Sequence, residues 1–160
     1  MNDGAWSQLA YDAVMKAKDT YNISVKYTEN IKPTEMEAVF TDYASQGYDL
    51  IIGHSFSFGD AALAVAERYP DTKFIVIDGT VSSENVASYT LKMQEVGYLE
   101  GIAAGMMTKT NKVGFVAGLV GPAIIKVAEG YKLGVQAVNP NCDVYTCLLY
   151  TSPSPRDGAT

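Results

Sequence analysis

The stretch Thr72–Gly79, which reads TKFIVIDG, decides the fold class of this 160-residue chain. Residues 74–77 are all apolar, and Asp78 and Gly79 end the run. A strand that is apolar on both faces is typical of the middle of a parallel sheet, where helices cover both sides. We therefore predict a buried central strand here, with Pro70 ending the element before it.

Strand and helix patterns alternate on either side of this stretch. A helix is predicted from Asp3 onward, because apolar residues then recur at helical spacing along a stripe that would lie on a core: Trp6, Leu9, Ala10, Ala13, Val14 and Ala17. Further strands are predicted at residues 23–27, 48–53, 85–91 and 112–118. Further helices are predicted at residues 34–46, 60–70, 94–108 and 122–138.

Local signals mark the ends of two of these helices. Thr34, followed three residues later by Glu37, is a capping-box pattern, and Gly47 stands where a left-handed residue would end the same helix. Asp60 is predicted to cap the next helix.

This alternation, with short connections, indicates an α/β domain with a parallel sheet covered on both sides. In such sheets, ligands bind beyond the carboxyl ends of the strands, where the loops lead into the helices. We therefore expect four loops to gather at one rim, at residues 1–6, 53–60, 78–85 and 117–122.

Composition narrows the classes of partner. The chain is 48% hydrophobic and 19% charged, which is typical of a globular protein with one real core. The net charge of −6 and the lack of any Lys/Arg cluster argue against a nucleic-acid partner. No apolar run reaches the roughly 18 residues that a membrane-spanning helix needs.

The sequence offers little for catalysis or metal binding. His54 is the single histidine and has no cysteine near it, so no zinc site is expected. No nucleophile–base pair, G-x-G-x-x-G motif or P-loop is present. We expect a protein that is not an enzyme, without metal or cofactor, in which His54 packs or forms a hydrogen bond.

Polar and aromatic residues at the expected rim each have two interpretations. Asp3 is either a helix cap or a carboxylate that binds a ligand. Trp6 is either a core residue or an aromatic ring that stacks on a flat ligand. Asp78 cannot stay buried and unpaired, so it binds backbone amides of the neighbouring loop or faces the ligand. Of Phe56 and Phe58, we expect one to be buried and one to cap the edge of the core.

Glycines recur at intervals of four in the helix predicted at 94–108. Gly97, Gly101 and Gly105 would form a dimer seam in a lipid-spanning helix, but Glu95 and Glu100 exclude that location. We interpret them as the side on which this helix packs closely on the sheet.

Several separated motifs together resemble a known family. D-G-x-W, QGYDLIIG, YPDTKFIVIDG and NVASYTLKMQEVGYLEGIAAGMMTKTNKVGFVAG follow in this order, and then comes P-x-I-x-K-V-x-x-G-Y-x-x-G-V-x-x-V-N-P. This order resembles the basic membrane protein family, the substrate-binding proteins of ABC importers related to purine-nucleoside receptors. The resemblance covers residues 2–146 and implies a two-lobed, type I periplasmic-binding-protein-like fold that closes on a nucleoside.

The resemblance also implies roles for particular residues. Trp6 falls on the aromatic position that stacks on the purine, and Asp3 on the acidic position before it. Ser55 and Phe56 lie in the loop that follows the strand 48–53, and Asp78 falls on the carboxylate at the rim. The implied partners are a nucleoside and ABC permease subunits, and the implied location is extracytoplasmic, held to the membrane only through an N-terminal lipid anchor.

The sequence departs from the family at both ends. The first strand of the family and its lipidated cysteine are not found, so we expect residues 1–109 to be most of an N-terminal lobe and 110–146 the start of a second lobe. Residues 147–160 are expected to be a tail of non-native origin, because Cys147–Asp157 resembles the translation of a sequencing-library adaptor. The alternative function is a ligand-sensing domain of a signalling or transcription-regulatory protein with the same fold.

Overall fold

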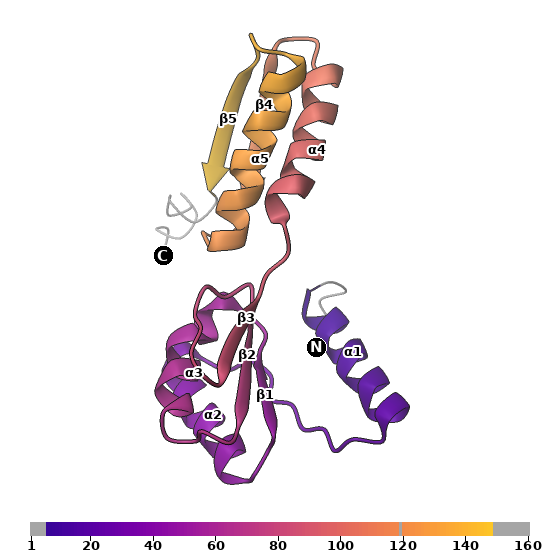
Figure 1. Ribbon diagram of the computed structural model, residues 1–160. Helices are drawn as coiled ribbons and strands as arrows, with labels where there is room; N and C mark the ends of the chain where they lie inside the picture. Colours follow the sequence, from indigo (N-terminus) through magenta and orange to yellow (C-terminus); the bar gives the residue numbers. More distant parts are fainter. Residues whose placement is uncertain (1–5, 119, 149–160) are drawn as a thin grey trace, which may run out of the picture. The chain divides into compact units, whose positions relative to one another are not determined.

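The computed structural model describes residues 6–118 and 120–148 (Figure 1). The chain forms two compact units, which divide between residues 89 and 90. Each unit has its own small parallel sheet. Within the described residues, none of the helices is both long and apolar enough to cross a lipid bilayer.

The first unit is built around a three-stranded parallel sheet in the order β1-β2-β3. Its elements are α1 (Trp6–Tyr21), η1 (Pro33–Glu35), α2 (Met36–Ser45), β1 (Leu50–Gly53), η2 (Phe56–Phe58), α3 (Gly59–Ala66), β2 (Lys73–Ile77) and β3 (Val86–Tyr89). The predicted central strand is confirmed, because β2 pairs in parallel with both of its neighbours.

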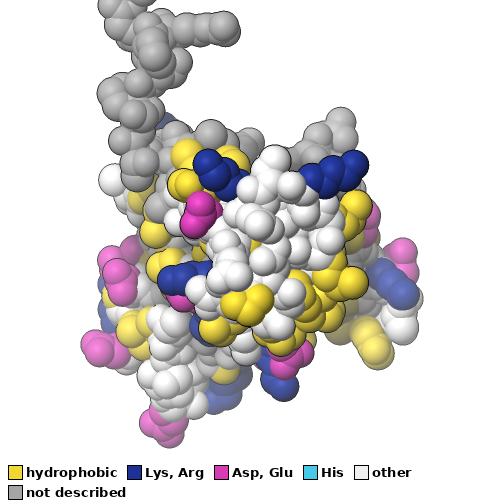
Figure 2. Space-filling view, turned by 90° about the horizontal axis from the view of Figure 1, so that it is seen from above, with side chains coloured by type: hydrophobic (Ala, Val, Ile, Leu, Met, Phe, Trp, Pro, Cys, Tyr) yellow, Lys and Arg dark blue, Asp and Glu magenta, His cyan; other side chains and the backbone are white. Residues whose placement is uncertain are grey.

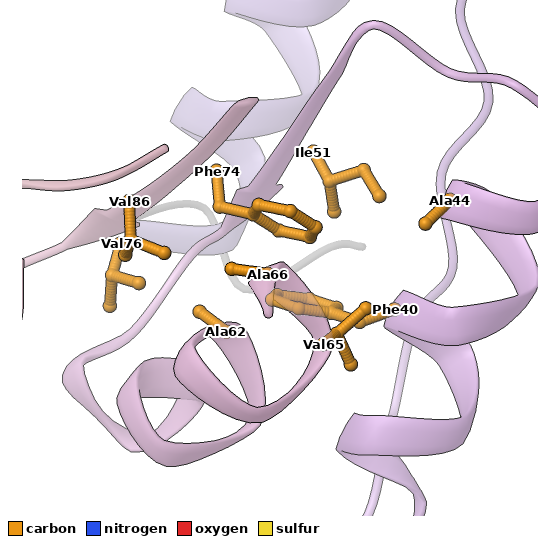
Figure 3. Close-up of a cluster of buried hydrophobic side chains, with 9 residues drawn as sticks. All are labelled: Phe40, Ala44, Ile51, Ala62, Val65, Ala66, Phe74, Val76 and Val86. Carbon is orange, nitrogen blue, oxygen red and sulfur yellow. The ribbon is translucent and has the colours of Figure 1, made fainter. Parts of the chain in front are cut away.

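One face of this sheet carries the core. Phe74 and Val76 of β2 are 1% and 0% exposed, and they lie with Phe40 of α2 among side chains from α2 and α3 (Figure 3). The ring of Phe40 stacks on that of Phe74, with 6.0 Å between the centroids. On the other face, Leu50 and Ile52 of β1 remain about half exposed, so the described residues cover this sheet fully on one face alone.

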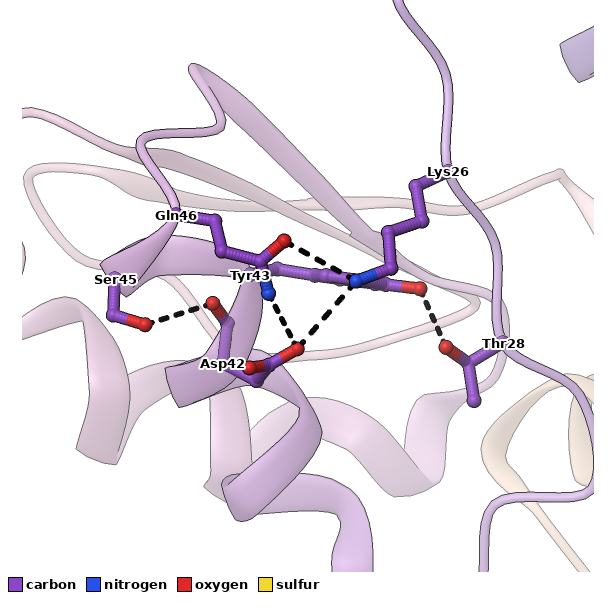
Figure 4. Close-up of polar contacts among 6 residues, drawn as sticks. All are labelled: Lys26, Thr28, Asp42, Tyr43, Ser45 and Gln46. Atoms are coloured by element: carbon purple, nitrogen blue, oxygen red, sulfur yellow. Dashed lines mark hydrogen bonds and ion pairs between the residues drawn. The ribbon is translucent and has the colours of Figure 1, made fainter.

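The prediction of a strand at residues 23–27 is wrong, because this segment does not pair with any described strand. Side chains hold the segment on α2 instead (Figure 4). The Nζ atom of Lys26 lies 3.2 Å from Oε1 of Gln46, 3.7 Å from Oδ2 of Asp42 and 5.0 Å from the centre of the Tyr43 ring. The Thr28 hydroxyl is hydrogen-bonded to the Tyr43 hydroxyl. A strand needs a ladder of backbone hydrogen bonds, and these contacts supply none.

Helix α1 does not pack as its apolar stripe predicts. None of its residues is buried, and Leu9 is 69% exposed. The hydrophobic periodicity therefore identified the helix correctly but not what covers it. A stripe of this kind shows that a face can be buried, whereas the covering surface has to come from another element.

The predicted helix ends are partly wrong. Before α2, the backbone N–H of Lys32 donates to the Glu35 carboxylate at 3.2 Å, so the turn forms earlier than the Thr34 capping box predicts. Gly47 does adopt the expected left-handed backbone, with φ of 80°. Asp60 lies in the first turn of α3 and is not its cap.

The second unit consists of α4 (Met93–Met107), β4 (Lys112–Ala117), α5 (Pro122–Val138) and β5 (Asp143–Leu148). β4 and β5 form a two-stranded parallel sheet, and Val113, Phe115 and Val144 pack against buried Tyr131 and Val135 of α5. Strand β5 was not predicted from the sequence. This strand extends into residues 147–148, and the non-native origin of the segment from 147 onward stays a prediction.

The glycines of α4 pack against α5 and not against the sheet, so the predicted packing partner is wrong. A Cβ atom built on Gly97 would lie 2.1 Å from the carbonyl oxygen of Val127, and one on Gly101 would lie 2.0 Å from that of Tyr131. The relationship is mutual, because a Cβ on Gly134 of α5 would lie 2.1 Å from the carbonyl oxygen of Tyr98. Helix α4 thereby belongs to the second unit, while the lobe boundary expected at residue 109 stays a prediction.

Hydrophobic side chains also remain at the surface among charged ones (Figure 2). On α4, Leu99, Met106 and Met107 are 67%, 72% and 79% exposed. Helix α4 is therefore buried along its glycine side and open along the side that carries these residues.

Candidate functional site

The candidate site lies at the carboxyl edge of the sheet in the first unit. Gly53 ends β1 opposite Val76 of β2, and Ile77 ends β2 opposite Tyr89 of β3. Because the strands are parallel, the loop that starts at His54 and the turn that starts at Asp78 leave from this same edge. Of the four loops expected at one rim, these two are confirmed to leave from one edge, whereas residues 1–5 of the first loop lie outside the described residues. The loop at 117–122 belongs to the second unit.

Asp78 turns the chain sharply where β2 ends. Its backbone is left-handed, with φ of 55°, a conformation that aspartate adopts more readily than most residues. Its N–H donates to the carbonyl oxygen of Tyr89 at 2.8 Å, which extends the ladder between β2 and β3 by one residue. The side chain is half-buried, and no described residue forms a hydrogen bond or ion pair with its carboxylate. One interpretation of Asp78 was that its carboxylate accepts hydrogen bonds from backbone amides of the neighbouring loop. The described residues show no such hydrogen bond.

The loop after β1 is tied down by serine hydroxyls and one phenylalanine. Ser55 caps the short helix η2, because its Oγ accepts the N–H of Ser57 at 3.3 Å and lies 2.9 Å from the Ser57 hydroxyl. Phe58 stacks on Phe40 at 5.4 Å and so anchors the loop to the core. Phe56 is half-buried and lies outside the core cluster. Phe58 packs against the core as a partly buried residue, so the expectation that one of the two phenylalanines is buried is wrong.

Trp6, in the first turn of α1, reaches the same loop. Its indole stacks on the imidazole of His54, with 4.4 Å between ring centroids and 22° between the ring planes. The indole Nε1–H donates to the His54 carbonyl oxygen at 3.4 Å, and His54 Nε2 lies 3.1 Å from the Trp6 carbonyl oxygen. A carbonyl oxygen can only accept, so Nε2 of His54 carries the hydrogen. Trp6 is still 44% exposed.

The structure therefore places four of the five predicted site residues in the first unit. Trp6, Ser55 and Phe56 belong to α1 and to the loop that Trp6 contacts, and Asp78 lies at the same edge of the sheet. Asp3 lies outside the described residues. The sequence predicted packing or hydrogen bonding for His54 and both are confirmed, but nothing in the sequence pointed to Trp6 as its partner.

The chemistry available at this edge is that of a binding site. It offers the open part of a large aromatic ring, serine hydroxyls and a carboxylate that no described residue pairs with. Among the described residues, no three or more His, Cys, Asp or Glu side chains come together in a group that could hold a metal ion. A partly exposed aromatic ring, together with hydrogen-bond acceptors at one edge of the sheet, suits a flat, partly polar small molecule.

Comparison with known proteins defines the class first. The chain superposes on a solute-binding protein of an ABC transporter system from Aeropyrum pernix K1 with a TM-score of 0.80 and 30% identity, over 94% of this chain and 44% of that one. The fold is thus that of the periplasmic-binding-protein-like solute-binding proteins.

The family follows from the sequence match. Residues 1–151 match the family described as ABC transporter substrate-binding protein PnrA-like, and the chain belongs to this family. The resemblance to the basic membrane protein family is confirmed. Substrate-binding proteins of ABC transporters are not enzymes, in agreement with the prediction.

Two curated relatives carry the names of different ligands. A Haloferax volcanii protein named as an ABC transporter glucose-binding protein, TsgA13, is 37% identical over 99% of this chain and 42% of its own length. The ABC transporter nucleoside-binding protein BmpA of Lactococcus lactis is 30% identical over 90% of this chain and 42% of its own length. The chain thus spans less than half the length of each relative.

Proposed function

We propose that this chain contributes the first ligand-binding lobe of an ABC importer's substrate-binding protein, and that the ligand is a nucleoside, most favourably a purine nucleoside. The observation that carries the proposal is the partly open indole of Trp6, which lies on the loop that leaves the sheet edge where no described residue pairs with the Asp78 carboxylate. A flat base stacks on the indole, and a carboxylate accepts hydrogen bonds from a ribose hydroxyl or a base N–H.

The energetics suit capture and release. Stacking on one aromatic ring contributes about 0.5 to 1.5 kcal/mol beyond the area that it buries. A carboxylate that no described residue pairs with gains a partner when the ligand binds, and a ligand without a matching donor leaves it desolvated and unpaired. In the whole protein, a second lobe closes on the other side of the ligand and the closed form is delivered to the permease.

The named relatives favour two ligand classes, nucleoside and glucose. Trp6 supports the nucleoside, because a purine offers a complete aromatic face to the indole. A sugar offers C–H groups to the same ring and more hydroxyls to the carboxylate. The two classes therefore differ in how strongly binding depends on Trp6 and how strongly on Asp78.

The test uses Trp6 itself, since it is the single tryptophan of the chain. Inosine, guanosine and glucose are titrated while the fluorescence of Trp6 is recorded. A saturable change with the purine nucleosides and none with glucose supports the proposal. A saturable response to glucose alone would replace it with sugar import, and no response to any of the three would contradict ligand binding at Trp6.

Two variants separate the carboxylate of the site from general effects of charge. Asp78→Asn should weaken nucleoside binding, because the acceptor loses its charge at the strand edge. Asp71→Asn is the matched control: Asp71 is exposed and lies just before β2, at the opposite end of the same strand. An equal loss of affinity in both variants would contradict a direct contact by Asp78.

The remaining parts of the proposal concern the whole protein. A lipid anchor at the N-terminus would hold it on the outer side of the cell membrane, next to the permease. The ligand-sensing alternative uses the same binding site, so only the genes beside the full reading frame distinguish the two roles. Permease genes support import, and a fused DNA-binding segment would support sensing.

A further inference from the structure

We infer that His54 is a positioning residue for the ligand-binding ring: it covers one face of the Trp6 indole and fixes the ring so that a ligand stacks on the opposite face. This inference rests on the proposed function for its ligand. Its structural part concerns only the pair of side chains and holds whichever flat ligand binds.

The contacts between the two residues are reciprocal. His54 donates from Nε2 to the Trp6 carbonyl oxygen, and Trp6 donates from Nε1 to the His54 carbonyl oxygen. Together with the stacked rings, these contacts restrain both the backbone and the side chain of Trp6. Two hydrogen bonds and one ring contact fix an orientation, whereas a single contact would leave the ring free to rotate.

These contacts also determine how Trp6 can meet a ligand. The indole N–H is already used within the protein, so the ring is not left with a free donor for the ligand. One face lies against the imidazole, so the exposed 44% of the residue belongs to the rest of its surface. We therefore infer that Trp6 contacts a ligand through the part of its ring that His54 does not cover.

The surroundings of Trp6 make this restraint necessary. Helix α1 has no buried residue that could hold it on the sheet. The loop that carries His54 is, in contrast, anchored to the core through Phe58 and capped through Ser55. His54 thus holds the Trp6 ring against a loop that is anchored to the core. Helix α1, which carries Trp6, has no such anchor of its own. A ring that is fixed in advance loses less conformational entropy on binding.

The first experiment measures the ring without ligand. Time-resolved fluorescence anisotropy and acrylamide quenching of Trp6 are compared in the wild-type chain, His54→Gln and His54→Phe. Glutamine keeps a hydrogen-bond donor but removes the ring, and phenylalanine keeps the ring but removes the donor. We expect a fast component of ring motion and stronger quenching in His54→Gln, and a partial effect in His54→Phe.

Ala64→Ser is the matched control, since Ala64 is exposed on α3, the helix that follows the same loop, and takes no part in the contacts between Trp6 and His54. Far-UV circular dichroism establishes that each variant keeps its fold. Unchanged anisotropy and quenching in both His54 variants would overturn the inference.

The second experiment measures purine-nucleoside affinity by calorimetry. His54→Gln should raise Kd roughly threefold to tenfold, in proportion to the loss of about one aromatic stacking contact, with partial rescue in His54→Phe. A mobile ring with unchanged Kd would overturn the positioning role. If the wild-type chain binds no nucleoside while the anisotropy changes as expected, the proposed function fails and the restraint of the Trp6 ring by His54 stands.

Discussion

Gly101 of α4 lies directly against the backbone of Tyr131 of α5, so that a Cβ atom on Gly101 would be 2.0 Å from the Tyr131 carbonyl oxygen. No real Cβ atom tolerates that distance, and the obstacle is backbone that cannot rotate away. The contact recurs along the pair, with Gly134 of α5 equally close to Tyr98 of α4. The two helices therefore approach each other as closely as they do because both carry glycine at the seam.

The first prediction is that Gly101→Ala destabilises the second unit by about 1 to 3 kcal/mol, because the two helices must move apart. Helix propensity alone predicts the opposite sign, since alanine favours a helix by up to about 1 kcal/mol over glycine. Urea unfolding followed by circular dichroism measures the difference. Ala103→Ser, at an exposed position of the same helix, should stay within about 0.5 kcal/mol of wild type. A Gly101→Ala variant more stable than wild type would contradict the close packing.

The second prediction concerns Asn85, which closes the end of α3. Its Nδ2 donates to the carbonyl oxygens of Ala66, Tyr69 and Thr72 at 3.2, 3.0 and 3.0 Å. Asn85→Asp replaces the donor with a charged acceptor that faces three carbonyl oxygens. We expect a loss of about 2 to 4 kcal/mol in the free energy of unfolding, from the lost hydrogen bonds and the new repulsion.

Asn22→Asp makes the same chemical change at an exposed position. That control should stay close to wild type in chemical denaturation. Equal stability of the two variants would show that the Asn85 amide does not hold the end of α3.

The third prediction is a loss of stability at alkaline pH through Tyr131. Burial raises the pKa of the Tyr131 phenol above its ordinary value, and the neighbouring Cys142 and Glu100 add to the effect. In the unfolded chain the phenol has its ordinary pKa of about 10. Above that pH the unfolded chain releases this proton while the folded chain keeps it, so the contribution of Tyr131 is present below about pH 10 and is lost as the pH rises through the folded pKa.

Tyr131→Phe tests this sign. The variant should lose about 1 kcal/mol at neutral pH, where the hydroxyl donates to the Gly114 carbonyl oxygen at 3.3 Å, but its stability should fall less steeply above pH 10. Tyr145→Phe, at a 57% exposed tyrosine of the same unit, should keep the alkaline slope of wild type. An identical slope in wild type and Tyr131→Phe would contradict the prediction.

The sequence alone predicted those elements of the fold that depend on a local pattern of residues. The central strand, the helix at 122–138 and the left-handed turn at Gly47 were predicted because apolar runs, Pro and Gly act over a few residues. Residues 23–27 have the composition of a strand but no partner strand, and pairing depends on distant residues. The glycines of α4 showed close packing but not its partner, because spacing along one helix does not identify the surface opposite.

The candidate site could likewise be predicted only where it depends on a local pattern of residues. Asp78 could be placed at the edge of the sheet, because a polar residue directly after an apolar strand lies at that end. The pairing of Trp6 with His54 joins residues 48 positions apart and could not be read from either segment. Periodicity even argued for Trp6 on a packed face of α1, whereas the structure leaves it at the surface against a loop.

The last prediction is that Trp6→Ala weakens ligand binding and leaves the fold intact. Trp6 is 44% exposed and lies outside the core cluster, so its removal should cost less than about 1 kcal/mol of stability. Nucleoside affinity should fall roughly five- to a hundredfold, as for the loss of a base-stacking aromatic. Phe74→Ala is the opposite case, because it empties a position that is 1% exposed and should cost about 3 to 5 kcal/mol. Calorimetric titration and thermal unfolding of both variants separate the two roles, and unchanged nucleoside affinity in Trp6→Ala would count decisively against this ring as the binding surface.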